Sequence, residues 1–314
     1  MLSKNLYSNP IGSIVREYTS NCFDSHLEAN VNEPVRITKG RDEEGTYISF
    51  IDVGVGLSPD RMKNIFMNYF SSTKRETDDL IGGFGLGSKS AISYTDFFYI
   101  NTVFDGRKYQ YIFSKGVTKP TLDLLSVEES TEHNGTEIRI YLLTVNGYNT
   151  DDTKFEKALK EQLCYFDNVW FDVWNIDNNY KIYEGNFFKW RNVHQYSEEM
   201  HIVLGKVSYP IDWNSIGLDP VNIPIGVKFN IGELLVTPNR ENIRYTDEII
   251  ALIQSRISST IDELNDIFNK QSSNYDSFFD WWENRKQKAH ILLGDDKLYL
   301  TGLKLTNKCR FTPL

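Results

Sequence analysis

Three polar residues near the N-terminus have the residue types and the spacing of a hydrolytic site. Glu17, Asn21 and Asp24 are spaced i, i+4 and i+7, so a helix presents all three on one face. A carboxylate held near water can act as a general base, and an amide oxygen is a suitable ligand for Mg2+. An ordinary solvated helix face is the alternative interpretation of the same residues.

A second group of candidate residues follows an apolar strand. In the stretch IDVGVG, Asp52 ends the strand, and Gly54 and Gly56 occupy alternate positions after it. The carboxylate can accept a hydrogen bond from an exocyclic amine, and the glycines let a flat ring lie against the backbone. Asp and Gly are also the commonest residues of turns, so a simple strand-ending turn is the alternative.

A glycine-rich segment, DLIGGFGLGSKSA at residues 79–91, leads into the start of a helix. Its four glycines are Gly82, Gly83, Gly85 and Gly87. Unpaired N–H groups and the helix dipole favour an anion at such a place, and phosphate is the expected ligand. The segment matches neither the P-loop pattern nor the dinucleotide fingerprint, so a flexible turn or hinge is the alternative.

Local patterns predict the elements that position these residues. Asn9 and Pro10 predict the start of a helix, which continues as an apolar stripe. The stretches EPVRITKG, GTYISFIDV and NGTEIRIYLL predict strands, and a hairpin is predicted to turn at Asp105 and Gly106. SPDRMKNIFMNYF and residues 88–94 predict two further helices. Together these patterns indicate helices combined with an antiparallel sheet.

The order of these motifs resembles that of the GHKL ATPase superfamily, which includes DNA gyrase B, the MutL proteins, sensor histidine kinases and the ninety-kilodalton heat-shock chaperones. The resemblance covers residues 9–143. It comprises E-x3-N-x2-D on a helix, D-x-G-x-G after a strand, G-G-x-G-x-G before a helix, and a strand that opens with Gly135 and Thr136. It implies the Bergerat ATP-binding fold with ATP and Mg2+ as ligands.

The resemblance implies a role for each matching residue. Glu17 is similar to the general base that activates the attacking water, and Asn21 to the Mg2+ ligand. Asp52 resembles the residue that binds the adenine amino group, with Gly56 lining the base pocket and Thr136 supporting the adenine. The other ATP-binding residues that the resemblance implies are Asp24, Gly54, Lys74, Gly82, Gly83, Phe84, Gly85, Leu86 and Gly87.

Residues 58–87 resemble the ATP lid of the superfamily. Within SSTK, Lys74 is similar to a lid lysine that some members direct at phosphate, and a solvated lysine is the alternative. Further along, VTPNRENIRY resembles the heat-shock chaperone loop whose Arg reaches the γ-phosphate. This likeness implies that role for Arg240, with Arg244 as a second candidate, whereas an Arg at a simple strand–helix junction is the alternative.

The expected fold class is α+β, a two-layer α/β sandwich followed by a second α/β domain of the middle, transducer-like kind. Turn residues cluster in TVNGYNTDD and predict a boundary there. Residues 1–148 are then the nucleotide-binding domain and residues 149–314 the middle domain. The heat-shock chaperone type is the nearest resemblance. The layout of short arm, nucleotide domain and middle domain, with NPIGSIVREYTSN at the start, also resembles the RIIA-like proteins of bacteriophages.

The composition argues against several classes of protein. A net charge of -9 argues against a main surface that wraps nucleic acid. The three cysteines are far apart, as in cytosolic proteins with reduced thiols, and the five histidines lack metal-ligand spacing. The sequence contains no membrane-length apolar run and no signal-peptide core. A cytoplasmic protein is therefore expected, in the host cytoplasm if the chain is viral.

The predicted function is Mg-dependent ATP binding and slow hydrolysis that drive a conformational switch. The switch would act on an unidentified protein partner or client, and an ATP-dependent homodimer is compatible with the resemblance. The alternative is a nucleotide-gated binding module with little or no hydrolysis, and a third reading is an interaction protein that has kept the fold and lost the ligand.

Overall fold

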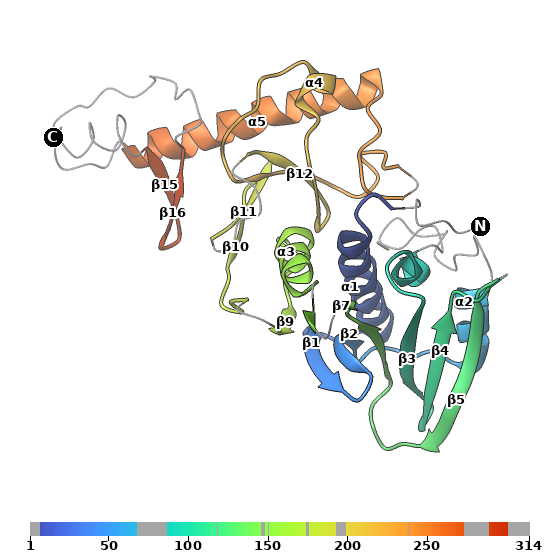
Figure 1. The fold of residues 1–314 in the computed structure, drawn as a ribbon. Helices are drawn as coiled ribbons and strands as arrows, with labels where there is room; N and C mark the ends of the chain where they lie inside the picture. The colour runs from blue at the N-terminus through green and yellow to red at the C-terminus, as the bar shows by residue number, and fades with distance from the viewer. Residues whose placement is uncertain are drawn as a thin grey trace. The chain divides into compact units, whose positions relative to one another are not determined.

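The computed structural model describes residues 7–67, 87–117, 119–145, 148–149, 151–173, 176–192, 199–237, 239–272 and 289–300. The chain forms two compact units, Met1–Asn178 and Asn179–Leu314. Figure 1 shows the elements of both units as a ribbon. No helix among the described residues is long and apolar enough to cross a bilayer.

A seven-stranded sheet forms the base of the first unit. All neighbouring strands are antiparallel except β1 and β9, which are parallel. The order across the sheet is β5 (Thr121–Glu129), β4 (Arg107–Ser114), β3 (Phe97–Phe104), β6 (Gly135–Tyr141), β2 (Gly45–Asp52), β1 (Val35–Asp42) and β9 (Val169–Asp172). A two-stranded pair follows the sheet in sequence, β7 (Thr144–Val145) with β8 (Tyr148–Asn149).

Helices pack on one face of this sheet. They are α1 (Pro10–Ala29), α2 (Pro59–Met67), the 3-10 helix η1 (Gly87–Ser93) and α3 (Asp152–Gln162). Tyr18 of α1 lies between Phe50 and Phe98 of the sheet, with ring centroids 5.8 and 6.0 Å away. Phe66 of α2 packs on Phe98 and Phe113 in the same layer. The predicted two-layer α+β arrangement is therefore confirmed.

Local sequence signals set the boundaries of these elements as predicted. The Asn9 side chain accepts a hydrogen bond from the Gly12 N–H at 3.0 Å, so it caps the first turn of α1. The β3–β4 hairpin turns at Asp105 and Gly106, both with positive φ, as a two-residue hairpin turn requires. Residues 88–94 were expected to be helical and fall largely within the 3-10 helix η1.

The second unit is also an α/β structure, as expected. Its sheet has the order β10 (Ile182–Glu184), β11 (Phe188–Arg191), β14 (Gly226–Phe229), β12 (His201–Leu204) and β13 (Val207–Tyr209). Its remaining elements are α4 (Trp213–Ile216), the long helix α5 (Asp247–Ser272), and the hairpin β15 (His290–Leu293) with β16 (Asp296–Tyr299). Arg256 anchors α5, because it donates hydrogen bonds to the Lys228 carbonyl and to Glu233.

The two units divide at residues 178/179, later than the turn-rich segment at which the sequence predicts a boundary. Strand β9 pairs in parallel with β1, with Val169 opposite Val35. Phe155 and Leu159 of α3 are fully buried, and α3 packs beside α1. The turn-rich segment therefore lies inside the first unit, where it connects β6 to α3. The chain continues through α3 before β9 pairs with β1, because two parallel strands need a long connection between them.

Fragments of the chain test this division. We expect a fragment of residues 1–178 to unfold cooperatively on heating, because it contains every strand of the seven-stranded sheet. A fragment of residues 1–148 lacks α3 and β9, so α1 loses its covering helix and β1 becomes an edge. Its melting temperature, followed by circular dichroism, should be lower by about 10 °C or more. Equal melting temperatures for the two fragments would contradict the assignment of α3 and β9 to the first unit.

Candidate functional site

The buried carboxylate of Asp52 connects helix α1 to the end of strand β2. Its Oδ1 atom accepts hydrogen bonds from Ser25 Oγ at 2.8 Å and from the Gly54 N–H at 2.9 Å. The Thr136 backbone N–H is a third donor to this carboxylate. Asp52 is only 7% exposed, and burial raises its pKa to about 6 although all three hydrogen bonds favour the charged form. A buried carboxyl group with a perturbed pKa is a frequent mark of a functional site.

Thr136 lies beside Asp52, as the motif order predicts. The two residues face each other in the pairing of β2 with β6. The Thr136 and Thr102 hydroxyls are 3.2 Å apart, and Thr102 Oγ1 also accepts from the Leu57 N–H and donates to the Gly135 carbonyl. These hydrogen bonds join β3, β6 and the segment after β2 around the Asp52 side chain.

Close backbone packing explains the glycines around Asp52. A Cβ atom on Gly54 would clash with Ser25, and one on Gly135 would clash with the Asp52 carbonyl. Gly56 has a φ of +67°, and a Cβ atom there would clash with the Val103 carbonyl. The protein itself therefore needs these glycines for the approach of helix and strands, whatever ligand they also admit.

Glu17 lies against the last glycine of the glycine-rich segment. A Cβ atom on Gly87 would clash with Glu17 Oε2, so a larger residue there would displace the Glu17 carboxylate. Glu17 is 4% exposed, and Arg16 Nε is 3.4 Å from Glu17 Oε1. Asn21 is partly buried and Asp24 is buried further along the same helix. The helix motif and the start of η1 thus meet at Glu17 and Gly87.

Part of the predicted phosphate-binding segment falls outside the described residues, and so does most of the predicted lid. Residues 59–67 of the lid form α2, and Gly87 opens η1. The predicted site residues outside the described part of the chain are Lys74, Gly82, Gly83, Phe84, Gly85 and Leu86.

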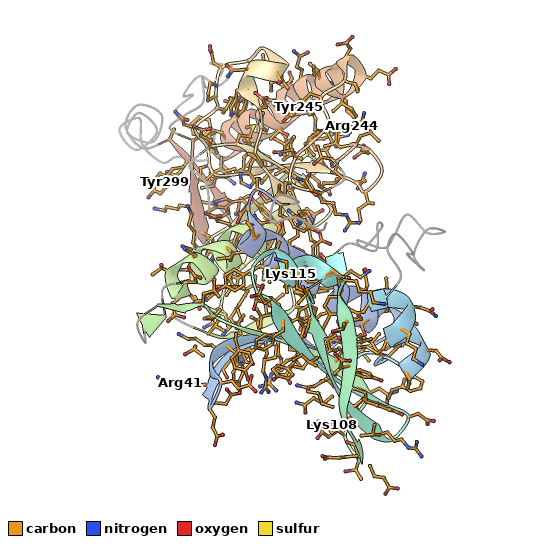
Figure 2. The ribbon with its side chains drawn as sticks, turned by 45° about the vertical axis from the view of Figure 1, so that its right-hand side comes forward. Arg41, Lys108, Lys115, Arg244, Tyr245 and Tyr299 are labelled. Carbon is orange, nitrogen blue, oxygen red and sulfur yellow. The ribbon has the colours of Figure 1, made fainter. Side chains whose placement is uncertain are left out.

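Arg240 occupies a tight loop of the second unit. Val236 and Ile243 form a bridge across the base of the loop, and the Arg240 N–H donates to the Thr237 carbonyl at 2.8 Å. Arg240 itself has a φ of +55°, which is unusual for a residue with a side chain. Arg244 follows the bridge and is exposed, and Figure 2 shows it with Tyr245 in this unit.

Sequence patterns alone did not single out three polar residues near the site. Ser25 binds Asp52, and His26 Nε2 accepts from the Val53 N–H at 2.9 Å. Burial lowers the pKa of His26, in keeping with a neutral ring that accepts this bond. Lys89, two residues after Gly87, is 5% exposed, and burial lowers its pKa to about 8. All three lie within two residues of a motif residue, but only these tertiary contacts distinguish them from ordinary polar positions.

No cluster of three or more His, Cys, Asp or Glu side chains able to hold a metal ion occurs in the part of the chain that the structure describes. Asn21, partly buried on the same helix as Glu17, presents an amide oxygen of the kind that can be a ligand of Mg2+.

No protein-family model matches the chain, and no curated protein matches it in sequence. Two solved structures of the ATPase region of Saccharomyces cerevisiae topoisomerase II are similar to it. The one bound to dexrazoxane has 11% identity over 80% of this chain and 85% of that chain, with a TM-score of 0.49. The other has 12% identity over 79% of this chain and 85% of that chain, with a TM-score of 0.47. Both scores are below 0.5, so the site is assigned on the contacts of this chain alone.

The raised pKa of Asp52 means that ionisation of this buried carboxyl group lowers the free energy of unfolding. The folded state holds the proton up to about pH 6, whereas an unfolded Asp releases it near pH 3.8, so stability is lost as the pH rises through this window. Above it the cost is about 3 kcal/mol. The substitution Asp52→Asn removes the ionisation. Its free energy of unfolding relative to the wild type should therefore increase between pH 4 and pH 7, as measured by urea denaturation.

Asp42→Asn is the matched control for this measurement. The Tyr141 hydroxyl donates to Asp42 at 2.6 Å and lowers the pKa of that carboxyl group. Its stabilising contribution is present above about pH 4 and is lost as the pH falls below it, so this control should show almost no change between pH 4 and pH 7 and should change only in more acidic solution. A pH-independent difference between Asp52→Asn and the wild type would contradict the raised pKa.

Proposed function

We propose that the chain is a Mg-dependent ATPase of the GHKL type that uses ATP to drive a conformational switch. The observation that carries this proposal is the contact between Glu17 and Gly87, a buried carboxylate at the end of a glycine-rich segment. Ser25, on the same helix, donates a hydrogen bond to Asp52 at the end of β2. Helix α1 therefore carries Glu17, the candidate general base for hydrolysis. Through Ser25 it also supports Asp52, the candidate group for recognition of adenine.

Asp52 would recognise adenine. A carboxylate offers about four acceptor positions, and Ser25, Gly54 and the Thr136 N–H use three of them. A free position can accept the adenine amino group. Guanine has a carbonyl oxygen at the equivalent place, which a carboxylate repels. The proposal therefore includes a preference for ATP over GTP, with Thr136 beside Asp52 supporting the base.

Glu17 would orient the attacking water and take its proton. Backbone N–H groups of the glycine-rich segment, ending at Gly87, would hold the phosphates, because such groups favour anions at the start of a helix. Lys89 follows on η1, and with a pKa of about 8 it is mostly charged at neutral pH, so it is suited to balance phosphate charge. Asn21 would hold Mg2+, which supplies charge neutralisation to the phosphates when it is bound.

Arg240 would complete the site from the second unit. The left-handed backbone conformation of Arg240 costs about 1 kcal/mol or more of conformational free energy. The hydrogen bonds of the loop hold this conformation, so the backbone from which the side chain extends is fixed. In this proposal ATP binding brings Arg240 to the γ-phosphate, where a guanidinium stabilises developing charge. The movement would be the output delivered to a protein partner. The heat-shock chaperone and RIIA resemblances remain predictions from the sequence motifs.

A nucleotide-gated binding module is the second candidate. The observation that favours it is the ion pair between Arg16 and Glu17, with Arg16 Nε 3.4 Å from Glu17 Oε1 and both side chains buried. A carboxylate engaged in this way is a weaker base for water. In that case the chain would bind ATP and change conformation with little turnover.

Paired variants separate the two candidates. We expect Asp52→Ala to abolish ATP binding, because the acceptor for the adenine amine is lost, and Glu17→Gln to keep binding while hydrolysis falls about 100-fold. Calorimetry with ATP and phosphate release with Mg2+ measure the two properties. Glu132→Gln on the surface is the control. Undiminished affinity in Asp52→Ala would refute the adenine assignment, and wild-type binding without turnover would favour the gated module.

Arg240 has its own test. We expect Arg240→Asn to slow hydrolysis about 100-fold with little change in ATP affinity, because the guanidinium acts on charge that develops during the reaction. Asn tolerates the left-handed backbone, so the loop should be kept. Arg244→Ala and Lys297→Ala, both at exposed positions of the same unit, provide the comparison. Unchanged turnover in Arg240→Asn would restrict that residue to a role in the loop.

A further inference from the structure

Strand β5 forms one edge of the seven-stranded sheet, and Figure 1 shows it at the outside of the first unit. It is nine residues long and pairs with β4 on one side. No strand among the described residues pairs with its other side. An edge of this length offers a row of backbone N–H and carbonyl groups to a further strand.

Three large aliphatic side chains of β5 are exposed to solvent. Leu124, Leu125 and Val127 are 52%, 51% and 44% exposed. The pairing with β4 is interrupted here, because the consecutive residues Gln110 and Tyr111 face Ser126 and Leu124 and leave Leu125 as an extra residue. Charges, proline and β-bulges protect an ordinary edge strand. This edge has a bulge and acidic residues, but it also exposes three aliphatic side chains in its centre.

Acidic residues flank the apolar row. Residues 121–132, TLDLLSVEESTE, contain four carboxylates and no Lys or Arg. Asp123, Glu128 and Glu129 are all exposed. Lys108 lies opposite Glu128 on β4, but its Nζ forms an ion pair with Glu132 at 2.9 Å. Figure 2 shows Lys108 in this part of the unit. The edge as a whole therefore has an excess of negative charge.

This charge selects among possible occupants. A second copy of β5 would bring two strands of the same negative charge together, which is unfavourable. A segment with alternating basic and aliphatic residues has the opposite charge and covers the apolar row. Strand addition takes its affinity from backbone hydrogen bonds and its specificity from alternate side chains, so both features of this edge would be used.

We propose that β5 is a docking edge for an extended basic and aliphatic segment of a partner protein, which adds to the sheet as a further strand. The backbone of the segment pairs with β5, its aliphatic residues cover Leu124, Leu125 and Val127, and its Lys or Arg residues pair with Asp123, Glu128 and Glu129. This surface is separate from the nucleotide site in its residues, and the inference does not depend on the proposed ATPase activity.

A defined peptide tests the proposal on the full chain. The probe is a fluorescein-labelled peptide of alternating Lys and Val, nine residues long and blocked at both ends. Its analogue carries N-methyl groups on alternate backbone nitrogens and cannot form a strand pair. A third peptide replaces Lys by Glu. Binding is followed by fluorescence anisotropy, and protection of residues 121–129 is followed by hydrogen exchange.

We expect the Lys-Val peptide to bind and to slow exchange in β5, with at least a tenfold weaker affinity for the N-methylated and the Glu peptides. Val127→Lys should weaken binding at least tenfold, because it removes apolar area and adds repulsion at an exposed position that does not carry the fold. Leu292→Lys, 46% exposed on β15, is the control and should leave binding unchanged.

Three results would overturn the proposal. They are no binding of the Lys-Val peptide, equal binding of the N-methylated analogue, and unchanged binding by Val127→Lys. Sedimentation of the chain alone provides a further check. A dimer that Val127→Lys dissociates would assign the edge to a second copy of this chain and would equally refute a basic partner segment.

Discussion

The packing of helix α1 against the seven-stranded sheet is the constraint on which the candidate site depends. Ile14, Val15 and Tyr18 are buried in this layer, and burial of each such side chain contributes about 2 kcal/mol. Burying this stripe fixes the rotation of the helix. The same rotation brings Glu17 to Gly87 and Ser25 to Asp52, so the packing of the core also places the side chains of the site.

Small residues make this placement possible. Gly54 faces Ser25, and a Cβ atom there would strike the helix backbone, whereas a Cβ atom on Gly87 would displace the carboxylate of Glu17. These glycines permit close approach within the protein itself. In the proposed function, their backbone N–H groups would also meet a ligand.

Features that depend on a few neighbouring residues could be predicted from the sequence, whereas features that depend on contacts between distant residues could not. The cap at Asn9, the hairpin turn at Asp105 and the alternation of the strands act over a few residues, so they were predictable. The parallel pairing of β9 with β1 joins residues far apart in the chain, and the local sequence around Val169 does not predict this pairing. The site residues Ser25, His26 and Lys89 were missed for the same reason, because only their tertiary contacts distinguish them from ordinary polar positions.

The negative charge of Asp52 is more than its structural hydrogen bonds require. Ser25 Oγ, the Gly54 N–H and the Thr136 N–H all donate to this side chain, and an amide oxygen could accept such bonds as well as a carboxylate does. An Asn would do so without the ionisation that burial makes costly at neutral pH. A carboxylate adds acceptor positions and negative charge, which the surrounding donors do not fully use. In the proposed function, the amino group of adenine would use this remaining acceptor capacity at the end of β2.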